Sequence, residues 1–357
     1  MSVGIAGLGW VTPLGVDLAL VADAILQAET PEVTAVENPE TRQLHHYYAV
    51  PPKLVEQLGR NPRLRRSSAI SYFAVAAGLA ALENAGVAAG SVPTDRTAVV
   101  FAIADGGVHY TRRFYEQIAR QGAQAASPLL FPETVYNAPA SHLSALLGID
   151  GASYTLVGDN SVGLAALSFA TELLETSAEL DQCVVVGSEE VDWVLCQAYR
   201  DWRLSTAGTR AEICAPIPQG AVLSEGAGAV VLRREGRCSL EAVHSGVPFF
   251  RRREAGAALQ RAVSELVPDA SPDLVVSSAN GSFIDNAEAA VLAGLAPRAR
   301  VVFPKASLGE APGASALWQI IVAALAVEAG EAANALVPVI GFNQQASAAH
   351  IARSETA

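Results

Sequence analysis

The stretch YTLVGDNSVGLAALSFATELLE, residues 154–175, decides the fold class, because it reads as a short β-type run, a tight turn and a long apolar helix. In an α/β protein such a turn presents reactive groups, since free backbone N–H groups and the positive end of the helix dipole meet there. A nucleophile at this turn would be Ser or Cys with a base beside it. The turn instead offers Asn160, whose carboxamide neither attacks nor titrates, followed by Ser161. We expect Ser161 to be an N-cap that accepts hydrogen bonds from the first helical turn.

Composition describes a globular protein with an acidic surface. The chain has 357 residues, 51% of them hydrophobic, which is enough to bury one large core or two modest ones. A net charge of −12 argues against a nucleic-acid or anionic-membrane surface, since both need a basic face. Two basic runs, at residues 63–66 and 251–253, are read either as solvated helix entries or as local phosphate or partner contacts. We predict a cytoplasmic protein, because the sequence has neither a signal-peptide pattern nor an apolar run of roughly 18 residues that could span a membrane.

The cysteines and glycines point to no bound group. Cys183, Cys196, Cys214 and Cys238 show no CxxC spacing and no clustered His, so they indicate neither a metal site nor a disulfide framework. We expect them to be buried thiols. No glycine loop of a phosphate-binding type is present, and the sequence therefore predicts no cofactor and no metal.

The order of elements repeats along the chain. Residues 30–66 read as an irregular excursion, and ISYFAVAAGLAALENAG (residues 70–86) predicts a helix that ends at Gly86. The apolar run TAVVFAIADGG (residues 97–107) has a counterpart in DLVVSSANGS (residues 273–282), and the turn at Asn160 has one at Gly309-Glu310. We therefore predict an α/β fold of two pseudo-symmetric βα halves in a five-layered α-β-α-β-α arrangement. The halves are expected at residues 1–235, with an insertion at about 105–140, and at residues 236–357, which form a compact second half.

Three segments in the right order resemble one family. They are GLGWVTPLG (residues 7–15), RRSSAISYFAVAAGLAALENAG (residues 65–86) and SEGAGAVVL (residues 224–232). They look like the signatures of the β-ketoacyl synthases of the thiolase superfamily, which condense acyl and malonyl thioesters. The resemblance spans nearly the whole chain and implies a thiolase-like fold.

The same resemblance locates the family's cysteine and two histidines at positions that carry other residues here. The elbow cysteine, three residues before a Gly and Leu-Ala-Ala-Leu, corresponds to Asn160. The histidine of a His-Gly-Thr segment corresponds to Asn280, and the histidine that ends a Lys-Ser-x-x-Gly-His segment corresponds to Glu310, while Lys305 is kept. All three departures argue against decarboxylative condensation, which needs a thiolate and imidazole donors. We expect Glu310 to form an ion pair with Lys305.

Sequences with these departures resemble the chain-length factors of the family. The resemblance implies a non-catalytic subunit that forms a heterodimer with an active β-ketoacyl synthase, shapes its acyl-chain tunnel in fatty-acid or polyketide biosynthesis, and meets acyl carrier protein as a further partner. It would place the insertion at the interface, with His109, Tyr110, Phe114 and Phe131 as tunnel or interface residues. Ordinary core or surface packing explains each of these aromatic side chains equally well.

Two other functions stay open on the sequence. One is an acyl-thioester hydrolase or acyltransferase with Ser161 as nucleophile, Glu310 as base and Lys305 as electrostatic support. It requires Ser161 to face a pocket and Glu310 to lie within hydrogen-bond reach of its hydroxyl. The other is a free-standing module that binds an acyl group or acyl carrier protein without a synthase.

Overall fold

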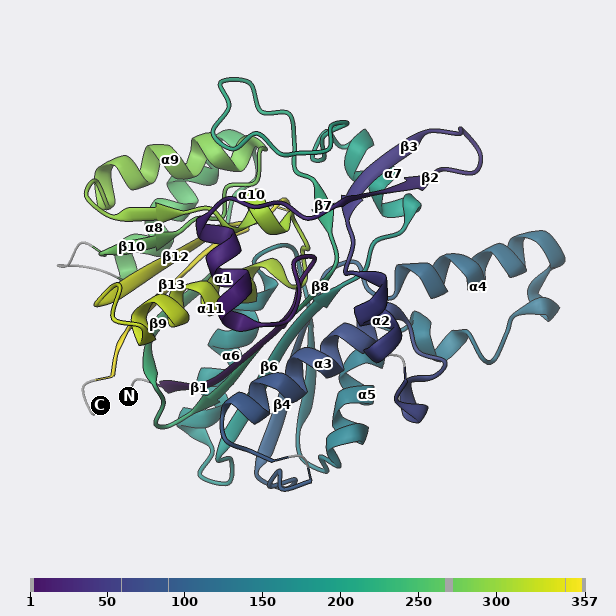
Figure 1. The fold of residues 1–357 in the computed structure, drawn as a ribbon, viewed down its shortest axis with the longest axis horizontal. Coiled ribbons are helices and arrows are strands. Elements are labelled where there is room, and N and C mark those ends of the chain that lie inside the picture. The colour runs from purple at the N-terminus through teal and green to yellow at the C-terminus, as the bar shows by residue number, and fades with distance from the viewer. Residues whose placement is uncertain (1–2, 59, 89, 267–271, 344, 355–357) are drawn as a thin grey trace.

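The computed structural model describes residues 3–58, 60–88, 90–266, 272–343 and 345–354 (Figure 1). In the first part of the chain the elements are β1 (Val3–Val11), α1 (Leu18–Leu26), β2 (Val33–Glu37), β3 (Leu44–Tyr48), α2 (Pro52–Leu58), η1 (Pro62–Leu64), α3 (Ala69–Asn84), β4 (Thr97–Ile103), α4 (Val108–Gln121), η2 (Ala123–Ala125), η3 (Phe131–Thr134), α5 (Ala138–Leu147), β5 (Ser153–Val157), α6 (Val162–Thr176), β6 (Gln182–Glu189), α7 (Trp193–Asp201), β7 (Leu223–Ser224) and β8 (Gly226–Arg233). They continue with β9 (Cys238–Pro248), η4 (Arg252–Glu254), α8 (Ala255–Leu266), β10 (Leu274–Val276), α9 (Phe283–Leu295), β11 (Arg300–Val302), α10 (Pro304–Leu308), α11 (Ser315–Glu328), β12 (Asn334–Ile340) and β13 (Gln345–Arg353).

Ten strands form one hydrogen-bonded sheet in the order β11-β10-β12-β13-β9-β1-β8-β6-β4-β5. The two halves of this order repeat the same arrangement. The strand that comes third along the chain in each half of the sheet, β5 or β11, lies at an outer edge, and the strand that comes first, β1 or β9, lies where the halves meet. The inner pairs β4–β6 and β10–β12 are parallel, whereas the last strands, β8 and β13, are antiparallel to both neighbours. The two halves meet where β1 pairs antiparallel with β9. The predicted pseudo-symmetric halves are therefore confirmed.

Side chains alternate between two cores along each buried strand, as the period of two requires. On β4, Val99 and Phe101 face the core under α3 and α5, while Val100 and Ala102 face the core that surrounds α6 and α11. On β10, Val275 faces the core under α8 and α9, while Leu274 and Val276 face the core that surrounds α6 and α11, which is the central core. Helices α6 and α11 thus lie between the two halves of the sheet, with outer helices on both sides (Figure 1). This arrangement confirms the predicted five layers.

The irregular excursion predicted for residues 30–66 is wrong. Strands β2 and β3 form an antiparallel hairpin there, and β7 joins it in parallel to make a small second sheet. The apolar residues of VTAVE alternate over only five positions, and histidines interrupt the alternation in LHHYY. The sequence therefore gives no clear strand pattern in this segment. The prediction of four buried thiols is also wrong for Cys214, which lies in an exposed loop before β7.

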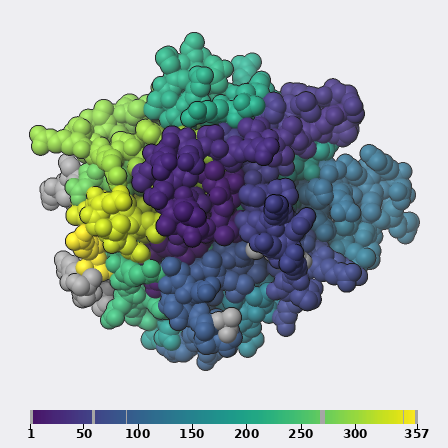
Figure 2. All heavy atoms as spheres, in the orientation of Figure 1, coloured from purple at the N-terminus to yellow at the C-terminus, as the bar shows by residue number. Residues whose placement is uncertain are grey.

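The segment between β4 and β5 extends away from the sheet. Helix α4 has no buried residue, and it forms a lobe on the right-hand side of the molecule (Figure 2). The domain division at residues 235 and 236 falls in the turn between β8 and β9, and it stays a prediction. Among the described residues no helix is long and apolar enough to cross a membrane.

Candidate functional site

Asn280, Lys305 and Glu310 form one buried hydrogen-bonded cluster. Glu310 Oε2 accepts from Asn280 Nδ2 at 2.6 Å and from Lys305 Nζ at 2.8 Å. The exposed fraction of each residue is 1% or less, so the ion pair predicted between Lys305 and Glu310 is found and is fully buried. Asn280 follows β10, while Glu310 follows the short helix α10 that carries Lys305. Glu310 is therefore the common acceptor of two buried donors, Asn280 and Lys305.

Asn160 makes no hydrogen bond to the described residues of that cluster. Its Oδ1 accepts from the backbone N–H of Phe342 at 3.0 Å, and its Nδ2 has no hydrogen-bond partner among the described residues. A backbone N–H beside a nucleophile elbow is a group that could stabilise an oxyanion. Here the N–H of Phe342 is already bonded to the Asn160 carboxamide.

Asp159 holds the turn of Asn160 against the loop after β12. Its Oδ2 accepts from Asn343 N at 3.1 Å, and its Oδ1 accepts from Ser161 N at 2.9 Å. A Cβ at Gly341 would lie 1.9 Å from Asp159 Oδ2, so only glycine lets the loop approach this closely. Burial raises the pKa of Asp159, although hydrogen bonds from Ser161 and Asn343 oppose the rise.

Ser161 stands at the N-cap position of α6, but its side chain caps no backbone N–H. The predicted capping role is therefore wrong. Its hydroxyl donates to Asp159 Oδ1 at 2.8 Å, because a carboxylate two residues away is a stronger acceptor than any other group in reach, and it also contacts Gln345 Oε1 at 3.4 Å. The hydrolase alternative requires Glu310 to be the partner of this hydroxyl. The hydrogen bonds of Glu310 instead go to Asn280 and Lys305.

The four predicted tunnel or interface residues lie on α4 and η3. His109 Nδ1 lies 3.2 Å from Asp192 Oδ2, and Tyr110 lies one residue further along the helix, under the guanidinium of Arg113. The rings of Phe114 and Phe131 pack 5.7 Å apart, and 54% of the surface of Phe131 is exposed. None of the four lines the pocket beside Asn160.

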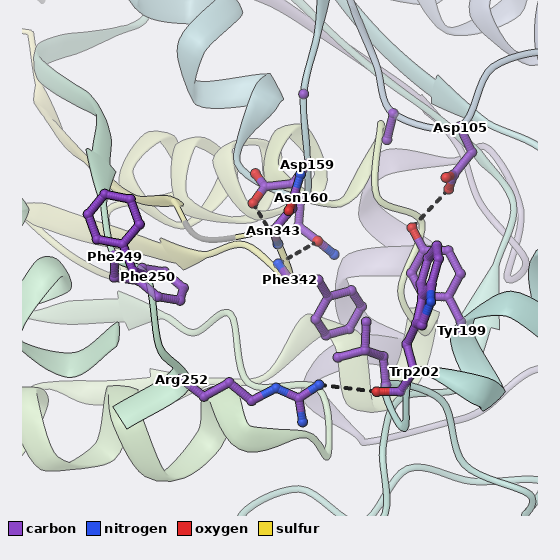
Figure 3. Close-up of a pocket in the computed structure, with 13 residues that line it drawn as sticks. Asp105, Asp159, Asn160, Tyr199, Trp202, Phe249, Phe250, Arg252, Phe342 and Asn343 are labelled. Atoms are coloured by element: carbon purple, nitrogen blue, oxygen red, sulfur yellow. Dashed lines mark hydrogen bonds between the residues drawn. The ribbon is translucent and has the colours of Figure 1, made fainter. Parts of the chain in front are cut away.

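A pocket of about 680 Å³ opens beside Asn160 (Figure 3). Asp159 and Asn160 form one side of it, and Tyr199 and Trp202 from the end of α7 form the other. Phe342 lies between these sides, and the pair Phe249 and Phe250 with Arg252 lines the rest. The pocket thus joins five segments that are distant in sequence.

Carboxyl groups gather on the Tyr199 side of the pocket. Tyr199 donates its hydroxyl proton to Asp105 Oδ2 at 3.0 Å, and Glu189 Oε2 accepts from the backbone N–H groups of Asp105 at 3.3 Å and Gly313 at 3.1 Å. Burial raises the pKa of Asp105 to about 6, against the opposing hydrogen bond from Tyr199. Burial, and after it the nearby charge of Asp105, raise the pKa of Glu189 well above its ordinary value. This side of the pocket disfavours negative charge.

Sequence reasoning missed most residues of this pocket. Tyr199 belongs to α7 and Trp202 follows the end of this helix, whose start Asp192 marks as an N-cap residue that accepts from Val194 N. Asp105 directly follows β4, and side chains at the carboxyl ends of parallel strands commonly line sites. Arg252 belongs to a basic run of the sequence, but no sequence pattern places it beside Asn160.

The described residues bring together no group of three His, Cys, Asp or Glu side chains suited to hold a metal ion.

The fold is that of the thiolase-like ketosynthases. The chain is similar to a solved structure titled the ishigamide ketosynthase/chain length factor, with a TM-score of 0.87 at 15% identity over 99% of each chain. It is similar to a β-ketoacyl synthase from Burkholderia phymatum, with a TM-score of 0.85 at 16% identity over 99% of this chain and 100% of that one. A third structure, AntDE:AntF, described as a type II polyketide synthase acyl-carrier protein in complex with its ketosynthase bound to the hexaketide, gives a TM-score of 0.76 at 14% identity over 99% of each chain.

Residues 1–237 match the family model described as β-ketoacyl synthase, N-terminal domain. This match covers more than half of the chain, and the chain therefore belongs to the β-ketoacyl synthase family. A curated relative, 3-oxoacyl-(acyl-carrier-protein) synthase 2 of Vibrio cholerae, is 24% identical over 196 residues, which are 54% of this chain and 47% of the relative. The chain thus matches about half the length of that relative.

Proposed function

We propose that this chain is a non-catalytic ketosynthase-like subunit, which pairs with an active β-ketoacyl synthase and shapes the space that holds the growing acyl chain. The state of the family's three reactive positions carries this proposal. Asn160 cannot form a thioester, and Glu310 accepts hydrogen bonds from both Asn280 and Lys305 inside the protein. Condensation requires a thiolate to carry the acyl group and free donors to stabilise the enolate.

The outer edge of β5 supports a protein partner. β5 is the last strand of the sheet, no described strand pairs with its other edge, and the exposed fractions of Tyr154 and Val157 are 38% and 56%. An apolar edge strand left open is a ready template for a strand of another chain. Helix η3 contacts both α4 and α5, and the segment from α4 to α5 exposes further large apolar residues, which are Tyr115, Leu129, Phe131, Val135 and Tyr136. Several large exposed apolar residues in one region are typical of protein interaction sites.

His109, Tyr110, Phe114 and Phe131 belong to this same region, so we propose that they border the interface and the acyl space. The names of the similar structures, a ketosynthase/chain length factor and a ketosynthase with its acyl-carrier protein, support a synthase as the stable partner and an acyl carrier protein as a second one.

Coexpression with the β-ketoacyl synthase encoded nearest to this chain tests the proposal, with size-exclusion chromatography and mass determination as the readout. We expect a one-to-one complex in which mass spectrometry finds acyl groups on a cysteine of the synthase only. A stable homodimer that ignores the synthase and turns over acyl thioesters would contradict it. A monodisperse chain that copurifies with acyl carrier protein alone would favour the free-standing binding module.

Thr155→Pro probes the proposed edge directly. The backbone bonds from Val99 N to Ala152 O and from Gly158 N to Ile103 O show which alternate residues of β5 bond to β4, so the N–H of Thr155 points to the open edge. Proline there removes an outward donor and spares the bonds to β4. We expect loss of the complex with little change in the unfolding of the isolated chain, whereas the control Thr155→Val keeps the complex.

A further inference from the structure

The β2–β3 hairpin leaves the main sheet and lies against helix α7 (Figure 1). Val36 and Tyr47 of the hairpin pack against a small apolar cluster that includes residues of α7. In the turn of the hairpin, Asn38 Nδ2 donates to Gln197 Oε1 on α7 at 3.1 Å. On its other side β3 pairs with β7 through only two residue pairs. A single buried group in this contact therefore has a large influence on how firmly the hairpin is held.

His45 is a buried polar side chain within this contact. It lies opposite Val36 in the register of the hairpin, and it shares a face of β3 with Tyr47, so it points toward α7. Its exposed fraction is 6%, and its Nε2 has no hydrogen-bond partner among the described residues. A neutral imidazole tolerates one unpaired nitrogen, whereas an imidazolium would bury a charge and a second N–H donor without an acceptor at Nε2.

The surroundings of His45 on α7 disfavour its protonation. Burial, the largest effect, lowers the pKa of His45, and the charge of Arg200 acts in the same direction. A side-chain hydrogen bond with Gln197 and the charge of Asp201 oppose them. Asp201 Oδ1 already accepts from Gln197 Nε2 at 2.9 Å. A proton on His45 is therefore disfavoured while the hairpin is packed, and it is favoured once the imidazole reaches water.

The strands packed with β3 do not change this balance. His46, the next residue of β3, also opposes the proton, and Glu37 of β2 is paired with Arg42 at 2.7 Å. Glu225, which follows β7, accepts from Val50 N at 3.1 Å. Burial raises the pKa of Glu225 from 4.5 to about 7, so between these values its protonation stabilises the packed state as the pH falls. A loss of packing on acidification thus has the sign of His45 and not that of Glu225.

We propose that His45 is an acid-sensitive latch, which releases the β2–β3 hairpin from α7 when its imidazole takes up a proton. The ordinary pKa of histidine is 6.5, so below this pH the released hairpin binds the proton that the packed hairpin disfavours. Release also loosens the pocket beside Asn160, because Tyr199 and Phe342 belong to the cluster that the hairpin packs against and both line that pocket. This inference goes beyond the subunit pairing, since it concerns the isolated chain.

Hydrogen exchange of the full chain at pH 7.5 and pH 5.5, followed by mass spectrometry and divided by the intrinsic rates, tests the proposal. We expect residues 33–48 to exchange up to about tenfold faster at pH 5.5, the limit set by a pKa of 6.5 in the released hairpin. Residues 193–201 of α7 should follow, whereas the buried strand β12 should not change. Unchanged protection of the hairpin, or an equal increase in β12, would overturn the latch. An unchanged α7 would overturn its link to the pocket.

His45→Phe keeps a ring in the contact and removes the titratable group. We expect the effect of pH on the hairpin to disappear in this variant, whereas His46→Gln, on the opposite face of β3, keeps it. Because Glu225 is present in both chains, comparing His45→Phe with the wild type at each pH cancels its contribution. His45→Gln, which is smaller and also uncharged, is the second variant if the phenyl ring does not fit. An effect of pH that persists in both variants would contradict the role of His45.

Two charge variants on α7 test the same proton in opposite directions. Asp201 favours the imidazolium, so Asp201→Asn should enlarge the acid effect on the hairpin, and asparagine keeps an oxygen for Gln197. Arg200 opposes the imidazolium, so Arg200→Gln should reduce the effect. If both variants changed the acid effect in the same direction, ionisation of His45 would not be its cause.

Discussion

At the scale of single residues, the three positions that the resemblance assigns to the family's reactive residues have two different environments. Asn280 and Glu310 are part of the core, with almost no exposed surface, and Glu310 Oε2 accepts from both Asn280 and Lys305 while its Oε1 has no partner among the described residues. Asn160 is equally buried, but half of its carboxamide still faces a pocket. Asn280 and Glu310 are thus enclosed in the core, whereas Asn160 borders a pocket.

Glu310→Gln should destabilise the protein strongly. The substitution keeps the shape of the side chain but leaves the ammonium of Lys305, whose exposed fraction is 1%, without its counter-ion. Breaking a buried pair on one side costs about 3–5 kcal/mol of unfolding free energy. Urea denaturation measures the loss. In the double variant Lys305→Met with Glu310→Gln the loss should be smaller than that of Glu310→Gln alone, and a single variant as stable as the wild type would contradict the account.

Asp105→Asn should stabilise the protein at high pH. The pKa of Asp105 is raised to about 6 in the folded state, whereas it is near 4 in the unfolded state. Between about pH 4 and pH 6 the folded state therefore holds more protons than the unfolded state, and stability falls as the pH rises. Asparagine keeps the oxygen that accepts from Tyr199 and cannot ionise. We expect a gain of about 2–3 kcal/mol at pH 8 and little change at pH 4 from a shift of about two units.

Urea denaturation of wild type and variant at both values of pH checks this. Asp150→Asn, at an exposed position, is the control and should change stability at neither pH. A gain for Asp105→Asn that is the same at pH 4 and pH 8 would rule out ionisation as its cause.

At the scale of elements, one carboxylate anchors the protruding helix α4. Asp192 accepts from Arg112 Nε at 3.0 Å and from Val194 N at 3.1 Å at the start of α7, and it lies 3.2 Å from His109 Nδ1. Burial acts to raise the pKa of Asp192. The hydrogen bonds from His109 and Val194 and the charge of Arg112 outweigh burial and hold this pKa below its usual value. Because α4 has no buried residue, this contact does much to fix the helix on the body.

Asp192→Ala should therefore loosen α4 more than it destabilises the whole chain. We expect a loss of about 1–2 kcal/mol in unfolding free energy from the missing cap of α7. Hydrogen exchange across residues 108–121 should become much faster, whereas the exposed neighbour Arg113→Ala should leave it nearly unchanged. Unaltered exchange in Asp192→Ala would show that α4 is held by other contacts.

The elements that the sequence predicted are those whose periodicity is long and apolar. Helices α3 and α6 and strand β4 are almost entirely apolar on their buried faces, so burial and propensity agree. The β2–β3 hairpin carries histidines and partly buried residues, and α7 mixes charged and apolar residues, so neither gave a clear pattern. The capping prediction for Ser161 failed because its backbone, at φ −89° and ψ −6°, is already helical, whereas a residue that caps with its side chain typically has an extended backbone.

At the scale of the whole molecule, the repeat of strand order was predictable, since each half has the same sequence of apolar runs. The family resemblance predicted the reactive positions, and that assignment stays a prediction, whereas no feature of the sequence predicted the pocket. Its residues Asp105, Asn160, Tyr199, Arg252 and Phe342 come from segments far apart in the chain. Only the three-dimensional packing of both halves brings them together, and no local spacing in the sequence records that packing.

Both halves share one central core, and this predicts that they fold as a single unit. Helix α11 of the second half packs on strands of the first, where Trp318 Nε1 donates to Ala227 O at 2.9 Å. A Cβ at Gly228 would lie 2.9 Å from Leu317 Cβ, so strand and helix are in direct contact. A fragment of residues 1–235 would expose the face of β1, β6 and β8 that α11 covers. No other element of the fragment would cover this apolar face, so it would be left in contact with water.

We therefore expect the full chain to unfold in one calorimetric transition, with equal calorimetric and van't Hoff enthalpies. The fragment 1–235 expressed alone should aggregate, and coexpression with residues 236–357 should restore a soluble pair, because β1 can again pair with β9 and α11 can again fill the central core. If the fragment 1–235 gave a cooperative transition of its own near the melting temperature of the full chain, the halves would be independent domains. The central helices would then be an interface between domains, and the pocket beside Asn160 would depend on how the two domains dock.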